Sequence, residues 1–269
     1  MKSVLITGAY GGMGRALSER LAACGVRVYA LDRHATPTPC ENIIPIEADV
    51  TDSESLMRAL SLIEDGELSA ILHFAGVYML DSLVEMSEEE FRRIFDINLN
   101  GVFLVNRAAI KKLSRGGKIL ITTSELAPLD PLPFTGIYAI TKAALDKYAY
   151  SLRMELSLLD ISVSVLRAGA VDTGMISASC EALDRFCGKT ELYSVSAENF
   201  KRIVDSVEAH RVPPEKIAKR VEKILRKKSP RFAYSINRNP LLLLLNALPT
   251  GAQLWVIKKI LRRKNKKGK

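Results

Sequence analysis

Short apolar runs alternate along the chain with longer segments in which apolar residues recur every three or four positions. Apolar runs without strict alternation are typical of strands covered on both faces of a parallel sheet, and the longer segments predict helices between them. Strands are predicted at residues 3–7, 26–31, 43–47, 70–74, 118–123, 162–167 and 231–235. Helices are predicted at residues 12–24, 53–63, 87–113, 136–159 and 213–228. This pattern predicts an α/β fold with a single doubly wound parallel sheet of about seven strands and helices on both faces.

A glycine-rich loop follows the first predicted strand and opens the first predicted helix. Gly8 allows a tight turn, Gly12 lets the backbone approach a pyrophosphate, and Gly14 lets helix and strand pack without a Cβ between them. The helix N-terminus offers free N–H groups to phosphate. A glycine-rich turn without a ligand is the alternative for this motif alone. We predict a Rossmann-type dinucleotide site whose loop contacts come from Gly8, Tyr10, Gly11, Gly12, Met13 and Gly14.

Two carboxylates follow later strands of the predicted sheet. Asp32 ends the second strand, where a carboxylate accepts the adenosine ribose hydroxyls and repels a 2′-phosphate, so NAD(H) is favoured. Arg33 keeps NADP(H) as the alternative, because an arginine can pair with that phosphate. Asp49 and Val50 follow the third strand and suit the adenine edge. A helix cap for the helix that starts at Ser53 explains Asp49 equally well.

Tyr138 and Lys142 are four residues apart at the start of a predicted helix, so both side chains project from one face. A tyrosine with an ordinary pKa near 10 is a poor base at neutral pH. A nearby ammonium, joined by an oxidised nicotinamide, lowers that pKa. Ser124 ends the preceding strand, where an open α/β sheet places its ligand-binding groups. This placement favours a catalytic site over a surface cation–aromatic pair.

Together these residues resemble the short-chain dehydrogenase/reductase family. The elements that carry the resemblance are Thr7-Gly8-x3-Gly12-x-Gly14, Asn98 within Asp96-Ile97-Asn98-Leu99-Asn100-Gly101, Ser124, and Tyr138-Ala139-Ile140-Thr141-Lys142. They occur in the family's order and at its spacing over residues 1–235. The segment beyond them resembles the C-terminal segments of steroid- and retinoid-type members, so the chain is identified as a steroid- or retinol-dehydrogenase-like member.

The resemblance implies a role for each residue of a catalytic tetrad. Tyr138 is the general acid/base, and Ser124 hydrogen-bonds the substrate oxygen. Lys142 lowers the pKa of Tyr138 and holds the nicotinamide ribose. Asn98 lies at an irregularity in its helix and holds a water that leads to Lys142. Further cofactor contacts are implied at Ala75, Gly76, Gly169, Val171 and Thr173, the last being the threonine that contacts the nicotinamide carboxamide.

Three departures from the family pattern concern geometry rather than the tetrad. Phe74 replaces the asparagine of the family's Asn-Ala-Gly, and Ala168 replaces the proline of its Pro-Gly. Ser124 precedes the tyrosine by 14 positions instead of 13. We interpret this as one inserted residue within residues 128–134, with Thr123 as the alternative for the serine's role.

Residues 170–212 contain no predicted strand and only weak helical periodicity at residues 197–210. An insertion of this size in a compact domain is more often functional than not, and we predict a substrate-binding lid. Its apolar candidates are Met175, Ile176, Leu183, Phe186, Leu192 and Tyr193. Ordinary helix packing explains any one of them equally well. Taken together they favour a bulky, lipophilic alcohol or ketone over a small polar one.

The net charge of +9 is concentrated at the C-terminal end. From Lys223 onward there are 14 Lys and Arg and no Asp or Glu, which leaves residues 1–222 with 25 basic and 30 acidic residues. The extension at residues 236–269 also carries five consecutive leucines and Trp255. Such a segment at residues 240–269 suits a peripheral contact with a membrane, and a helix packed on the core or on a neighbouring subunit is the equal alternative. Nucleic acid is disfavoured, since no binding fold accompanies the bases.

Composition excludes several classes of protein. The four cysteines form no CxxC pair and only three histidines are present, so no metal site is expected. Reduced thiols indicate a cytoplasmic protein, and disorder or a disulfide scaffold does not fit the composition. The N-terminal apolar run is too short for a signal peptide, and no apolar stretch is long enough to span a membrane.

The sequence therefore predicts an NAD(H)-dependent oxidoreductase of a bulky, lipophilic secondary alcohol or ketone of steroid, retinoid or fatty type. Residues 1–235 form its catalytic domain and residues 236–269 its extension. The resemblance implies a homodimer or homotetramer built through the helices at residues 87–113 and 136–159. One alternative is NADP(H)-dependent reduction of a polar sugar or acyl thioester. An alternative from another class of function is a nucleotide-sensing or membrane-tethered binding protein with little turnover. The intact tetrad argues against this alternative.

Overall fold

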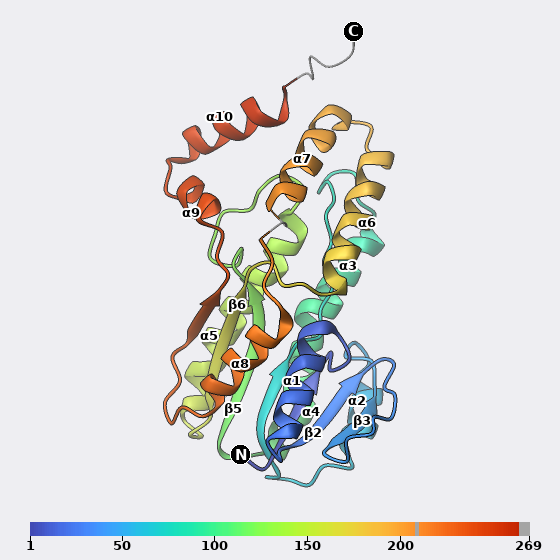
Figure 1. Cartoon of the computed structure of the whole chain (residues 1–269), viewed down its shortest axis with the longest axis vertical. Coiled ribbons are helices and arrows are strands. Elements are labelled where there is room, and N and C mark those ends of the chain that lie inside the picture. The colour runs from blue at the N-terminus through green and yellow to red at the C-terminus, as the bar shows by residue number, and fades with distance from the viewer. Residues whose placement is uncertain (208–209, 264–269) are drawn as a thin grey trace.

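The computed structural model describes the backbone of residues 1–207 and 210–263, and the same side chains except those of residues 176–179 and 205–207 (Figure 1). Seven parallel strands form one sheet in the order β3-β2-β1-β4-β5-β6-β7. They are β1 (Ser3–Thr7), β2 (Arg27–Asp32), β3 (Ile43–Glu47), β4 (Leu68–His73), β5 (Leu113–Ser124), β6 (Ser162–Ala168) and β7 (Ala233–Ile236). The predicted doubly wound sheet is confirmed. Its strand order reverses between β1 and β4, where such sheets bind ligands at the carboxyl ends of the strands.

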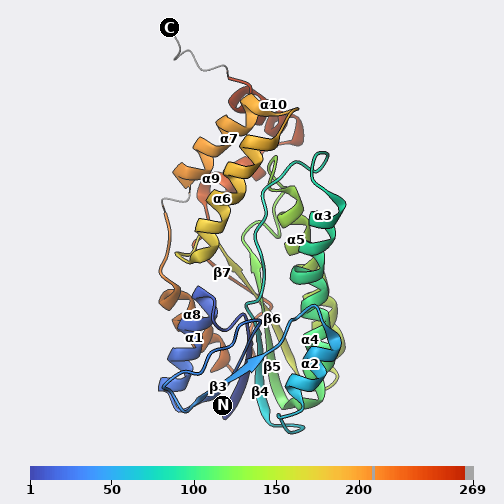
Figure 2. The same ribbon diagram turned by 90° about the vertical axis from the view of Figure 1, so that its right-hand side faces the viewer.

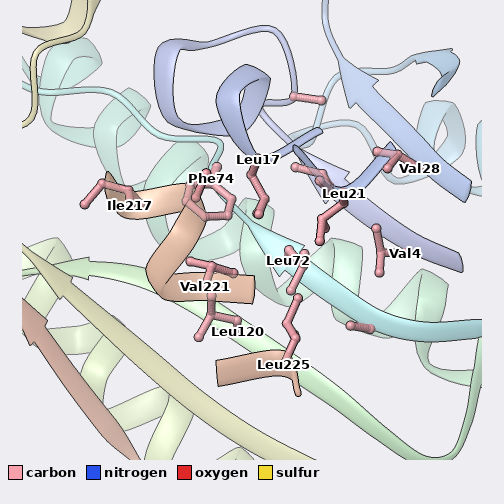
Figure 3. Close-up of a cluster of buried hydrophobic side chains, with 14 of the residues drawn as sticks. Val4, Leu17, Leu21, Val28, Leu72, Phe74, Leu120, Ile217, Val221 and Leu225 are labelled. Atoms are coloured by element: carbon pink, nitrogen blue, oxygen red, sulfur yellow. The ribbon is translucent and has the colours of Figure 1, made fainter. Parts of the chain in front are cut away.

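Helices cover both faces of the sheet, as the apolar strands require (Figure 2). One face is covered by α1 (Gly12–Ala23) and α8 (Pro214–Leu225), and the other by α2 (Ser53–Leu60), α4 (Gly101–Ala109) and α5 (Gly136–Ser157). Figure 3 shows Leu17, Val221 and Phe74 within the first of these apolar layers. Phe74 therefore contributes apolar packing at the position where the family has a polar asparagine.

The single helix predicted at residues 87–113 is in fact interrupted. It consists of α3 (Glu88–Phe95), a π-helical turn at Asp96–Asn100, α4, and a 3₁₀ turn at Ile110–Lys112. A capping box opens α3, because Ser87 Oγ accepts from the Glu90 N–H at 3.1 Å and the Glu90 carboxylate accepts from the Ser87 N–H at 3.1 Å. The irregularity that the resemblance implied at Asn98 is confirmed by the π-helical turn.

Residues 170–212 contain two helices, α6 (Gly174–Lys189) and α7 (Ser194–Val207), beyond the carboxyl ends of the strands (Figures 1 and 2). The prediction of only a weak helix at residues 197–210 was wrong because it missed α6, whose glycines and small polar residues obscure its periodicity. Leu183 and Phe186 are buried and Tyr193 packs beside them, whereas Leu192 is exposed. Ile176 has its side chain outside the described part of the chain.

The last two helices of the described part of the chain, α9 (Pro240–Asn246) and α10 (Thr250–Leu261), lie at the same end of the molecule as α6 and α7 (Figures 1 and 2). Leu261 is buried against α7, and Asn199 Nδ2 donates to the Leu261 carbonyl at 2.8 Å. The inner side of the extension thus packs on the core, as one of the two predictions required. Among residues 1–207 and 210–263, no helix is both long and apolar enough to cross a membrane.

A buried polar network beneath the site makes stability depend on pH. His73 Nε2 lies 2.9 Å from Asn106 Oδ1, and Asn106 Nδ2 donates to the Tyr148 hydroxyl at 3.1 Å. Burial lowers the pKa of His73 to about 4. Between pH 6.5 and pH 4 the unfolded chain therefore binds a proton that the folded chain does not. We expect the free energy of unfolding to fall by about 3 kcal/mol as pH is lowered through this window.

Urea unfolding at a series of pH values from 7 to 4 measures this effect. His73→Gln, which retains hydrogen-bonding groups but does not titrate, is expected to flatten the pH dependence by about that amount. The same slope in both proteins would contradict the assignment to His73.

Candidate active site

Two adjoining cavities lie at the carboxyl ends of the strands. A cleft of about 1440 Å³ follows β1, β2 and β4, and a pocket of about 220 Å³ lies at the ends of β5 and β6. Residues that line both include Met13, Phe74, Gly76 and Thr173. The two cavities therefore form one extended site, with room for an elongated ligand and a second molecule beside it.

The glycine loop forms one end of the large cleft. Gly8 has φ of +65°, a left-handed conformation that favours glycine. A Cβ added to Gly14 would lie 2.1 Å from the Gly8 carbonyl oxygen, and one added to Gly12 would lie 2.5 Å from Thr173 Cγ2. The first turn of α1 contains no acidic residue, and no described side chain caps its start. A phosphate group fits here, because the exposed amides and the helix dipole favour negative charge.

We expect Gly14→Ala to abolish most dinucleotide binding and to lower the free energy of unfolding by about 1–3 kcal/mol. The added methyl group must displace the Gly8 carbonyl, which belongs to the backbone and cannot swing aside. Gly188→Ala in α6 is the matched control, since its Cβ would meet nothing within 4 Å. Cofactor titration by fluorescence and urea unfolding measure both effects. Normal dinucleotide affinity in Gly14→Ala would contradict this account of the loop.

The adenosine end of the cleft contains the predicted carboxylates. Asp32 is fixed in place, since its Oδ2 accepts from the Tyr10 N–H at 3.0 Å and its Oδ1 from the Arg33 N–H at 2.8 Å. Asp49 Oδ1 accepts from the Thr51 N–H and hydroxyl, both at 2.8 Å. Asp32, Arg33, Asp49 and Val50 all line the cleft.

The helix cap at the start of α2 is Asp52, whose carboxylate accepts from the Glu54 and Ser55 N–H groups. The reading of Asp49 as that cap is therefore wrong. Asp49 accepts hydrogen bonds within the loop that precedes the helix, and it lines the cleft.

Ser124, Tyr138 and Lys142 come together at the pocket, each less than a tenth exposed. Ser124 ends β5, Tyr138 lies in the first turn of α5, and a side-chain hydrogen bond joins them. Lys142 Nζ lies 5.6 Å from the centroid of the Tyr138 ring and 3.4 Å from the Thr122 carbonyl oxygen. Thr123 also lines the pocket, but its hydroxyl has no hydrogen-bond partner among the described residues. The geometry favours Ser124 over Thr123 as the serine of the tetrad.

The electrostatics of this trio are set by burial. Burial raises the pKa of Tyr138 to about 12, although the hydrogen bond with Ser124 acts in the opposite direction. Burial lowers the pKa of Lys142 to about 8. The expected lowering of the Tyr138 pKa by Lys142 is therefore not found in the protein alone, because desolvation of the phenolate outweighs the effects that favour it. The lowering was predicted for the lysine and an oxidised nicotinamide acting together.

Asn98 is fully buried behind the trio. Its Oδ1 accepts from the Val77 N–H at 2.8 Å, and its Nδ2 donates to the Val77 carbonyl at 3.0 Å and to Thr141 Oγ1 at 3.2 Å. Asn98 thus ties the loop after β4 to α5. A Cβ on Gly76 would lie 3.2 Å from Asn98 Oδ1 and 3.5 Å from Lys142 Nζ, so this glycine admits both groups. The water relay from Asn98 stays a prediction.

The remaining predicted cofactor contacts divide between the two cavities. Ala75, Gly76 and Thr173 line both, whereas Gly169 and Val171 line only the pocket. A Cβ on Gly169 would lie 1.9 Å from the Asn237 carbonyl oxygen, so close backbone approach explains this glycine without a ligand. Across the described part of the chain, no three His, Cys, Asp or Glu side chains are grouped so that they could hold a metal ion.

Several pocket residues were not predicted from the sequence, among them Tyr78, Glu125, Phe200 and Leu242. The Tyr78 ring contacts that of Tyr138 edge-on, with centroids 4.5 Å apart. Its position shortly after Gly76, at the same edge of the sheet, was a usable signal. Leu242 offered none, since it lies on α9 more than a hundred residues after Tyr138.

Polar contacts hold the C-terminal extension against this pocket. Glu125 Oε2 accepts from the Asn239 N–H at 2.6 Å, directly before α9. Asp130 N–H donates to Asn246 Oδ1 at 2.7 Å, and Gln253 Nε2 donates to Asp130 Oδ2 at 3.4 Å. Burial raises the pKa of Glu125. The loop between β5 and α5 thus fixes the extension as a wall of the pocket.

The same loop ends at Phe134, which has φ of +66°. A non-glycine residue in this region costs about 1–3 kcal/mol and persists only where its surroundings hold it. Here the Phe134 ring packs against Phe186 and Phe200, with centroids 4.6 and 5.4 Å away. The inserted residue proposed within residues 128–134 stays a prediction, and the packing shows how this loop meets α6 and α7.

The sheet, the glycine cradle and the buried Ser–Tyr–Lys group define a dinucleotide-dependent oxidoreductase of Rossmann type. Residues 2–184 match the short chain dehydrogenase family, and the chain belongs to that family. It is therefore an oxidoreductase that binds NAD(P) and acts on a small-molecule substrate.

Among its relatives are reductases of several kinds. The chain is 31% identical to versicolorin reductase 1 of Aspergillus parasiticus, over 66% of this chain and 72% of the relative. It is 31% identical to the 3-oxoacyl-[acyl-carrier-protein] reductase MabA of Mycobacterium tuberculosis, over 68% of this chain and 75% of the relative. Neither name refers to a steroid or a retinoid, so the steroid- or retinol-type assignment stays a prediction.

Solved structures with the same fold include two short-chain dehydrogenases. One, from Burkholderia cenocepacia in complex with NADP, has a TM-score of 0.71 at 21% identity and covers 97% of this chain and 99% of its own. The other, from Francisella tularensis, has a TM-score of 0.73 at 22% identity and covers 88% of this chain and 97% of its own. At these identities the likeness supports the fold alone.

Proposed function

We propose that this protein transfers hydride between NAD(H) and a bulky, lipophilic secondary alcohol or ketone of steroid, retinoid or fatty type. The observation that carries the proposal is the pocket beside Ser124 and Tyr138. Its outer walls are predominantly apolar and are formed by Leu126, Leu132, Phe200, Ile203, Val204 and Leu242. Apolar walls around two hydroxyl groups suit a ligand that is lipophilic except at one oxygen.

In the proposed reaction, Ser124 and Tyr138 hold the substrate oxygen, and Tyr138 takes the hydroxyl proton during oxidation or returns it during reduction. The bound dinucleotide supplies or accepts the hydride. Lys142 lies next to Tyr138 and stabilises negative charge as the phenol loses its proton. Asn98 keeps the loop after β4 in place beside Lys142. The apolar walls exclude water from the reacting carbon.

An activity screen tests the substrate class. Steroid, retinoid and fatty alcohols are compared with sugars, and the corresponding ketones with an acyl thioester, each with both dinucleotides. Faster turnover of the sugar or the acyl thioester would favour the alternative of a reductase for polar substrates. No turnover of any of them, with tight dinucleotide binding, would favour the binding-protein alternative.

The proposed preference for NAD(H) rests on the fixed carboxylate of Asp32 in the cleft. NADP(H) stays the alternative, since Arg33 lines the same cleft and the Burkholderia relative was solved with NADP.

We also propose a homodimer or homotetramer built through α3, α4 and α5. Apolar side chains on these helices are exposed, among them Phe103, Ile140 and Met154. Burial of these side chains between subunits would remove their apolar surface from water. Sedimentation velocity measures the oligomeric state. The proposed cytoplasmic location rests on the four free cysteines.

A further inference from the structure

The outer side of the C-terminal extension presents large apolar side chains to solvent. On α9, Leu241 and Leu244 are 68% and 65% exposed, and on α10, Leu254 and Trp255 are 63% and 62% exposed. The opposite side of α10 packs inward through Gln253, Ile257 and Leu261, four residues apart. On α9 no residue is buried, although Leu242 lines the pocket. The exposed side chains of the two helices therefore do not serve the core.

Positive charge lies on the same side of α10. Lys258, Lys259 and Arg262 follow Leu254 and Trp255 by one to two turns and are exposed. Lys259 Nζ lies 4.6 Å from the centroid of the Trp255 ring. The chain contains no Asp or Glu after Glu222, so no acidic side chain of the extension offsets this charge. The docking face, as we call it, consists of Leu241, Leu244, Leu254, Trp255, Lys258, Lys259 and Arg262.

We propose that the docking face binds the surface of an anionic lipid bilayer. Leucine and tryptophan side chains enter the boundary between headgroups and acyl chains, and lysine and arginine meet the anionic headgroups. A second copy of the chain fits this face poorly, because a twofold contact would place the basic cluster of Lys258, Lys259 and Arg262 twice in one interface, with no acidic side chain of either extension to offset it. The proposal concerns a surface outside the catalytic group, and it holds whichever substrate the enzyme uses.

The face belongs to an ordered part of the molecule that adjoins the substrate pocket. Glu125 and Asp130 hold α9 and α10 in place by the hydrogen bonds described above. Leu242 lines the pocket, while its neighbour Leu241 is part of the docking face. A bilayer at this face therefore contacts the same helix that contributes a wall of the pocket.

Flotation of the full-length protein with vesicles tests the proposal. Vesicles of one part phosphatidylglycerol to two parts phosphatidylcholine are compared with phosphatidylcholine alone, at low and high salt. We expect the partition coefficient to be at least tenfold larger for the anionic vesicles and to fall with salt, because the headgroup attraction is screened. Leu254→Glu/Trp255→Glu and Lys258→Glu/Lys259→Glu are each expected to reduce it at least tenfold.

Matched controls keep folding and charge separate from docking. Leu158→Glu alters a leucine just after the end of α5 that is 85% exposed, and Lys216→Glu/Lys219→Glu reverses the same charge on α8, so both should bind like the parent protein. Circular dichroism and dinucleotide affinity should be unchanged in all variants. Absence of vesicle binding by the parent protein would overturn the proposal, as would equal loss in the controls. If the protein self-associated without lipid and Trp255→Glu abolished that self-association, the face would be assigned to a second copy of the chain instead.

Discussion

Tyr138→Phe is expected to lower kcat by about 10²–10⁴-fold, the range that a positioned general acid/base contributes. The substitution removes only the hydroxyl that hydrogen-bonds Ser124, and the ring can keep its edge-on contact with Tyr78. Dinucleotide affinity and the free energy of unfolding should therefore change little. Steady-state rates with the best alcohol from the screen, fluorescence titration of the dinucleotide and urea unfolding give the three quantities separately.

Tyr150→Phe is the matched control, because it removes the same atom from an exposed tyrosine further along α5. Its kcat should equal that of the parent protein. Activity in Tyr138→Phe within a few fold of the parent would remove Tyr138 from the chemistry. A protein that turns over no substrate before or after the substitution, yet binds dinucleotide normally, would instead favour the binding-protein alternative.

The sheet could be predicted closely because its strands are local and apolar. β1 and β3 have the predicted bounds, and the other strands differ by a few residues at their ends, most in β5. β5 begins at Leu113, five residues before the prediction, because Leu113 pairs with Leu68 ahead of an irregularity in the ladder. The interruption of the helix at Asp96–Asn100 was not apparent from periodicity. Nor was the helix α6, because its glycines and small polar residues obscure the repeat.

The site could be predicted where its residues are close in sequence, or where they lie at the ends of neighbouring strands. The glycine loop and the Tyr138–Lys142 pair are local, and Ser124 follows from the rule that ligands bind at carboxyl ends of strands. Leu242 and the hydrogen bond from Asn239 to Glu125 arise only when the chain returns after β7. The direction of the Tyr138 pKa also required the structure, because burial determines it.

Asp32→Ser is expected to shift cofactor preference toward NADP(H) by about 10–100-fold. The carboxylate is fixed at the end of β2 by the Tyr10 and Arg33 N–H groups, so it cannot turn away from a 2′-phosphate. Like charges in contact cost several kcal/mol, and each 1.4 kcal/mol corresponds to a factor of ten in affinity. Removal of the charge abolishes this repulsion and leaves the neighbouring arginine side chain to attract the phosphate. Dissociation constants for NAD⁺ and NADP⁺, measured by fluorescence titration, give the shift directly.

Two further variants distinguish the ribose interaction from a general change in charge. Asp49→Ser removes a second carboxylate from the same cleft, and its Oδ1 already accepts two hydrogen bonds within its own loop. This variant should shift the ratio of the two dissociation constants less than Asp32→Ser does, because Asp49 follows β3 at the predicted adenine edge, although its charge also acts on Arg33. Arg33→Ala in the Asp32→Ser background should remove most of the gain in NADP⁺ affinity. If Asp49→Ser produced the larger shift, the ribose would lie at Asp49, and the preference for NAD(H) would lose its basis in Asp32.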